Sequence, residues 1–165
     1  GEELITGTRS INIGAGAGQK NDQTDNIFVG YKTGNNVTGT KNIFMGNNSG
    51  ENAKGSNNVA IGDNSLIGSS SESDTGSNNV AIGLNAGKFI KSSNNIFIGA
   101  EATSGDRKIG GDNIIIGYQG GKLMGITGTD TGPEANIIIG PNAGTTCEAN
   151  HNIYMGKTIH NIIHR

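Results

Sequence analysis

A five-residue phrase, Asn-(Ile/Val)-x-(Ile/Val/Met)-Gly, recurs along this chain at a nearly constant spacing. The copies are Ser10–Gly14 (a variant led by serine), Asn26–Gly30, Asn42–Gly46, Asn58–Gly62, Asn79–Gly83, Asn95–Gly99, Asn113–Gly117, Asn136–Gly140 and Asn152–Gly156. Successive closing glycines are 16, 16, 16, 21, 16, 18, 23 and 16 residues apart. Such a period with occasional insertions indicates a repeat architecture, in which each unit buries its apolar face only against its neighbours.

Each phrase is short, rich in aliphatic side chains and bounded by turn-forming residues, which predicts a β-strand. A small residue followed by glycine comes next, as in Ser49-Gly50, and suits a tight bend. A second, weaker strand is expected around Val37 and Ile90. No helical stripe of apolar residues is present. The sequence therefore predicts an all-β fold, a parallel β-roll (β-solenoid) of about nine 16-residue coils, as a single repeat domain over residues 1–165. Because both ends cut through a coil, we expect a segment of a longer fibre.

The composition alone resembles that of a low-complexity segment, with 32% hydrophobic residues, 29 glycines and no tryptophan. The regular placement of aliphatic pairs favours a stacked core instead. A formal net charge of −2 gives no electrostatic footprint for nucleic acid. No apolar run approaches the roughly 18 residues of a membrane-spanning helix, so we expect no membrane insertion by this segment.

The residue in the middle of each phrase predicts how copies of the chain associate. Side chains alternate along a strand, so the flanking aliphatics are expected to fill the interior and the middle residue to face outward. After Asn12, the middle residues are all apolar: Phe28, Phe44, Ala60, Ala81, Phe97, Ile115, Ile138 and Tyr154. A continuous apolar stripe usually marks an interface, so this ladder is the predicted homotrimer interface. The alternative is that these are ordinary scattered exposed residues.

Three insertions lie between a closing glycine and the next lead asparagine, at Asp63–Asn78, Ala100–Asp112 and Tyr118–Ala135. They are expected to project from the side of the coil opposite the main strand. Insertions on one side of a solenoid often build a binding face, but exposed loops also tolerate neutral length variation. The candidate contacts to a cell-surface glycan or protein receptor are Arg107, Lys108, Tyr118 and Lys122.

The remaining polar residues predict structure rather than chemistry. The repeated lead asparagine favours a stacked amide ladder over a glycan-binding array. Cys147 occupies the position of Val37 and is expected to be buried. His151, His160 and His164 are interpreted as surface histidines, and the paired acids have no companion base. We therefore predict no catalytic, cofactor-binding or metal-binding residues and no enzyme activity. The hexapeptide repeat of left-handed β-helix acyltransferases needs three six-residue units in each coil. Only one such unit is present in each 16-residue coil here, so that assignment is weak.

The phrase Asn-Asn-Val-Ala-Ile-Gly-x-Asn-(Ala/Ser), at Asn57–Ser65 and Asn78–Ala86, resembles the head repeats of YadA-like trimeric autotransporter adhesins. It is equally similar to repeats in phage and large-virus tail fibres. The resemblance implies a left-handed β-roll, three chains side by side around an axis, and a place on a virion tail fibre or a bacterial cell surface. The 16-residue period departs from the shorter repeat of those heads. A neck motif, a coiled-coil stalk, a membrane anchor and a self-cleaving chaperone domain are also missing from these 165 residues.

The leading hypothesis is thus an extracellular structural and adhesive fibre segment that attaches to a target cell. A loop-mediated glycan- or protein-binding module is the first alternative. Part of a surface-glycan depolymerase spike is the second, and it would need paired carboxylates in a groove.

Overall fold

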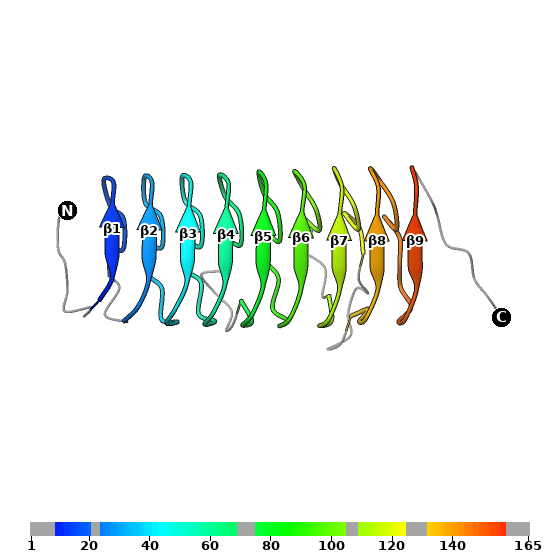
Figure 1. Cartoon of the computed structure of the whole chain (residues 1–165), viewed down its shortest axis with the longest axis horizontal. Helices are drawn as coiled ribbons and strands as arrows, with labels where there is room; N and C mark the ends of the chain where they lie inside the picture. The colour runs from blue at the N-terminus through cyan, green and yellow to red at the C-terminus, as the bar shows by residue number, and fades with distance from the viewer. Residues whose placement is uncertain (1–8, 21–23, 69–74, 105–108, 125–131, 158–165) are drawn as a thin grey trace.

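Nine parallel strands form a single sheet in which spatial order follows sequence order (Figure 1). This computed structural model describes residues 9–20, 24–68, 75–104, 109–124 and 132–157. The strands are β1 (Ile11–Ile13), β2 (Ile27–Val29), β3 (Ile43–Met45), β4 (Val59–Ile61), β5 (Val80–Ile82), β6 (Ile96–Ile98), β7 (Ile114–Ile116), β8 (Ile137–Ile139) and β9 (Ile153–Met155). The chain is therefore a β-solenoid, as predicted, and coil n below is the coil that contains strand βn.

Each strand pairs with the next in the register set by the repeated phrase. Phe28 lies opposite Phe44, and Ala60 lies opposite Ala81 despite the insertion between β4 and β5. The strands on either side of the longest insertion, β7 and β8, are also in register, with Ile115 opposite Ile138. The period of the phrase thus fixes strand pairing, and the insertions are absorbed outside the sheet.

The closing glycines are required by backbone geometry. Gly46 has φ 122°, and a Cβ there would overlap the backbone of Gly62 in the next coil. At the other end of the strand, the residue before the lead asparagine adopts a left-handed conformation, with φ 59° at both Lys41 and Asn57. These two turns bracket a strand that is only three residues long.

The middle residues of the strands fill the interior, so the predicted facing of the ladder is wrong. Phe28, Phe44, Ala60, Ala81, Phe97, Ile115, Ile138 and Tyr154 are all buried within the single chain, at 0–4% exposure. The Phe28 and Phe44 rings stack with centroids 5.5 Å apart. Side chains already buried within one chain cannot form its contact with another copy. The flanking aliphatics, which were expected inside, lie on the outer face of the sheet.

Turn glycines provide the space for this interior. A Cβ on Gly50 would overlap the Phe44 ring, and a Cβ on Gly34 would overlap the Phe28 ring. In coil 4 the sizes are exchanged, because the small Ala60 is accompanied by the fully buried Leu66 at the position of Gly50. In coils 2 to 4 the interior is therefore filled by complementary pairs, one residue from the strand and one from the following bend.

The return half of each coil is ordered without forming the second strand that was predicted. Val37 and Ile90 are buried there, and the Thr38 amide donates to the Ala53 carbonyl at 3.2 Å. The nine strands nevertheless account for all regular secondary structure in the described ranges. The return half of each coil is thus held to the next coil by backbone hydrogen bonds that do not extend into a second sheet.

The described flanks of the first insertion keep the geometry of a regular coil. The Gly68 amide donates to the Glu51 carbonyl at 2.8 Å, so the chain is still in register at that point. It rejoins at Thr75, whose hydroxyl accepts hydrogen bonds from the amides of Lys54 and Gly55 at 2.9 and 3.2 Å. The departure from the 16-residue period therefore lies in the return half of the coil, as predicted. Among the residues described, no helix is long and apolar enough to span a membrane.

Candidate interaction surface

The lead asparagines form a buried hydrogen-bonded ladder that fixes which strand face points inward. The Asn42 amide donates to Asn26 Oδ1 at 2.8 Å, and the Asn58 amide donates to Asn42 Oδ1 at 2.9 Å. Asn42 Nδ2 also donates to the Gly55 carbonyl, at 3.1 Å. The same arrangement continues to Asn152, whose amide donates to Asn136 Oδ1 at 2.9 Å. The predicted structural amide ladder is confirmed, and its side chains are occupied by the fold.

The outer side of the sheet is a continuous aliphatic face. It consists of the first and third residues of every strand, and each of them is exposed or half-buried: Ile11, Ile13, Ile27, Val29, Ile43, Met45, Val59, Ile61, Val80, Ile82, Ile96, Ile98, Ile114, Ile116, Ile137, Ile139, Ile153 and Met155. The exposed fractions reach 58% at Ile13 and 68% at Ile153.

The sequence analysis assigned these residues to the core; the lead asparagine would have placed them outside only once its own position inside the roll was known. Asn42 and Phe44 are two residues apart, so they share one strand face. If the asparagine ladder is internal, the middle residue must be internal too, and Ile43 and Met45 must face outward.

The dimensions of the aliphatic face are those of an interaction surface. Nine strands at about 4.8 Å spacing and three residues at about 3.3 Å rise give a surface of about 43 by 10 Å. Monomeric soluble proteins rarely expose a contiguous apolar patch larger than a few hundred Å². No polar side chain interrupts this face in any of the nine strands.

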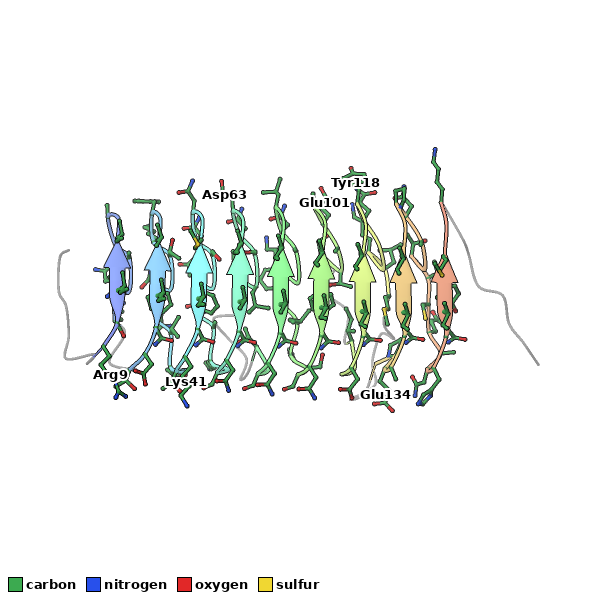
Figure 2. The ribbon with its side chains drawn as sticks, viewed as in Figure 1. Arg9, Lys41, Asp63, Glu101, Tyr118 and Glu134 are labelled. Atoms are coloured by element: carbon green, nitrogen blue, oxygen red, sulfur yellow. The ribbon has the colours of Figure 1, made fainter. Side chains whose placement is uncertain are left out.

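Two rows of turn residues border the aliphatic face on opposite sides. The upper edge comprises the residues that directly follow the closing glycines: Ala15, Tyr31, Asn47, Asp63, Leu84, Ala100, Tyr118, Pro141 and Lys157. The lower edge comprises the residues that directly precede the lead asparagines or Ser10: Arg9, Asp25, Lys41, Asn57, Asn78, Asn94, Asp112, Ala135 and His151. Figure 2 shows Asp63 and Tyr118 at one end of the strands, and Arg9 and Lys41 at the other.

Ion pairs along these edges join neighbouring coils. Arg9 Nε lies 2.7 Å from Asp25 Oδ1 on the lower edge. Beside the upper edge, Lys122 Nζ lies 2.6 Å from Glu101 Oε2, and Gln119 Nε2 donates to the same oxygen at 2.8 Å. The hydrogen bonds from Lys122 and Gln119 lower the pKa of the Glu101 carboxyl. Because these groups are partly exposed, such pairs align the coils but add little stability.

Of the four candidate receptor contacts, two lie in the described structure, Tyr118 and Lys122. Arg107 and Lys108 lie outside the described residues. Tyr118 is on the upper edge and 52% exposed, whereas Lys122 is engaged with Glu101. The proposed receptor contact by these residues therefore stays a prediction.

The groups with reactive chemistry are dispersed or paired with one another. Cys147, in the return half of coil 8, is buried as predicted and adjoins Tyr154 of β9. Burial raises the pKa of the Cys147 thiol, and burial together with the Cys147 contact raises the pKa of Tyr154 to about 12. His151 is exposed on the lower edge, and His160 and His164 lie outside the described residues. In the described part of the chain, no three His, Cys, Asp or Glu side chains are placed to hold a metal ion.

The surface that distinguishes this chain is therefore the aliphatic face with its two polar edges. Comparisons with protein-family models, curated proteins and solved structures give no match.

Proposed function

We propose that this chain is a shaft segment of a homotrimeric, extracellular fibre that serves attachment to a target cell, on a virion tail or a bacterial surface. In this proposal the roll is left-handed and three chains lie side by side. The solenoid supplies a stiff spacer, and the aliphatic faces of the three chains meet along the fibre axis.

The aliphatic face is the observation that carries the proposal. Ile43 and Met45 are 38% and 41% exposed in the middle of the row, not only at its ends. At about 25 cal/mol per Å², covering even 400 Å² of apolar surface on each chain is worth roughly 10 kcal/mol per chain before the losses of association. A solenoid of short coils has a thin interior, so burial between chains is a substantial addition to its stability.

Threefold association fits the shape of this surface. A face about 10 Å wide and about 43 Å long can line a common axis over its whole length when three rolls lie parallel. The resemblance of Asn57–Ser65 and Asn78–Ala86 to trimeric adhesin and tail-fibre repeats supports the same number of chains. The ladder from Phe28 to Tyr154 contributes to this fibre as the interior of each roll.

The decisive experiment compares two aspartate substitutions of exposed residues close in sequence. Ile43→Asp places a carboxylate on the aliphatic face, whereas Thr38→Asp places one on the return half of the preceding coil. A charge enclosed without a partner costs about 3–5 kcal/mol, and three copies would meet at the axis. We expect a trimer of 16.9 kDa chains for the unmodified chain and for Thr38→Asp in sedimentation at micromolar concentration.

Ile43→Asp should be monomeric under the same conditions and keep the β circular dichroism spectrum. A folded, monomeric unmodified chain would refute the assembly, and so would an Ile43→Asp variant that remains fully trimeric.

A further inference from the structure

The two edges of the sheet must meet each other in any closed ring of parallel rolls. Every strand runs from its lead asparagine on the lower edge to its closing glycine on the upper edge (Figure 1). If the aliphatic faces surround an axis parallel to the row of strands, each corner joins the upper edge of one chain to the lower edge of the next. Cyclic symmetry involves no translation along its axis. Each coil of one chain therefore faces the same coil of its neighbour.

Two coils carry a tyrosine on the upper edge and an aspartate on the lower edge. Tyrosine occurs on the upper edge only in coils 2 and 7, as Tyr31 and Tyr118. Aspartate occurs on the lower edge in the same two coils and no others, as Asp25 and Asp112. Within one chain these partners are at opposite ends of a strand, so their co-occurrence has no explanation inside the single roll.

From this match we infer that the tyrosine hydroxyls at positions 31 and 118 donate hydrogen bonds to the Asp25 and Asp112 carboxylates of the neighbouring copy. This inference rests on the trimer proposed above and adds the identity and register of its corner contacts. A hydrogen bond from a neutral hydroxyl to a carboxylate is charge-assisted and short, so it fixes the register along the axis. Two such contacts, five coils apart, would hold neighbouring rolls parallel and without stagger.

The accessibility of these residues agrees with the inference. Tyr31 and Tyr118 are each 52% exposed, and Asp112 is exposed. Asp25 also accepts the Arg9 guanidinium of the preceding coil, so coil 7 offers the simpler test.

The residues that would meet in the other coils from coil 1 to coil 8 are compatible with the same register. Coil 8 brings two apolar residues together, Pro141 and Ala135, and coil 4 brings Asp63 to the neutral Asn57. In coil 3, Lys41 faces the neutral Asn47. From coil 1 to coil 8, no pair places like charges against each other.

Disulfide trapping tests the contact directly. We would combine Tyr118→Cys with Asp112→Cys in a Cys147→Ala background, because alanine already occupies the equivalent position at Ala53. Within one chain the two positions are roughly 15–20 Å apart along the strand, whereas a disulfide needs Cα atoms within about 7 Å. A bond between them must therefore join two chains.

A matched control combines Tyr118→Cys with Asn57→Cys, which lies three coils away on the same edge. Asp112 and Asn57 have nearly equal left-handed backbones, with φ 62° and 59°, so cysteine is equally strained at both. After mild oxidation, we expect the first pair to give covalent trimers on a non-reducing gel, at least tenfold more than the control pair or either single cysteine variant. A reducing agent should return them to single chains.

Three results would overturn the inference, and sedimentation separates their causes. Trimers that cross-link no better than the control would show that the assembly exists with other corner contacts. Covalent dimers that never close into trimers would rule out the ring. A variant background that is monomeric before oxidation, together with a monomeric unmodified chain, would refute the proposed assembly itself.

Discussion

Replacing Phe44 with alanine should destabilise the roll itself. Its side chain is fully buried and stacks on Phe28 with ring centroids 5.5 Å apart. Phe→Ala substitutions in a core reduce the free energy of unfolding by about 3–5 kcal/mol, because they remove apolar burial and leave a cavity. Alanine is nevertheless the natural residue at this position in coil 4, where Leu66 occupies the place that Gly50 has beside Phe44.

This exchange of sizes allows a reciprocal test. Gly50→Leu alone should be destabilising, since even a Cβ at that position overlaps the Phe44 ring. The left-handed backbone adds about 1–2 kcal/mol, although Leu66 adopts the same region with φ 49°. Phe44→Ala combined with Gly50→Leu rebuilds the pairing of coil 4. We expect the double variant to lose no more than about 2 kcal/mol of unfolding free energy. That loss should be at least about 2 kcal/mol smaller than the sum of the losses in the two single variants.

Urea unfolding followed by far-ultraviolet circular dichroism measures all four proteins of this cycle. Each should be compared at one protein concentration, because association would add to the apparent stability. If the loss in the double variant equals the sum of the losses in the two single variants, strand and bend residues do not fill one shared space. A loss below about 1 kcal/mol for Phe44→Ala would contradict its place in the core.

Two further predictions concern the asparagine ladder and the buried tyrosine. Asn58→Ala removes the acceptor of the Asn79 amide and the donor to the Gly76 carbonyl, so the free energy of unfolding should fall by about 2–4 kcal/mol. Asn152→Ala changes the end of the ladder and should lose less than half as much stability in the same urea titration. The pKa of Tyr154 is about 12 in the folded chain and about 10 in the unfolded chain, so the unfolded chain loses the hydroxyl proton at lower pH. The free energy of unfolding should therefore fall between pH 10 and 12, by up to about 1.4 kcal/mol per pH unit. Tyr154→Phe should lack this extra slope, and an unchanged slope would show that the hydroxyl is not enclosed.

The sequence by itself determined the architecture because the pattern that carries it is periodic and local. An aliphatic phrase such as Ile43-Phe44-Met45, bounded by Asn42 and Gly46, forms a strand in every copy, and the repeat sets one coil on the next. The amide ladder was also predictable, because an asparagine repeated in register can satisfy the backbone of the neighbouring coil.

The facing of the strand was decided only by the tertiary structure. In Ile137-Ile138-Ile139 both faces are equally apolar, so alternation shows that the faces differ but not which of them is inside. The choice depends on residues elsewhere in the coil. The missing side chain of Gly144 leaves space for Ile138, just as Gly50 does for Phe44. The lead asparagine, which shares the inner face, finds its hydrogen-bond partners only in the stacked coils. These contacts between the strand and its own bend turn the middle residues inward and leave the flanking aliphatics on the surface.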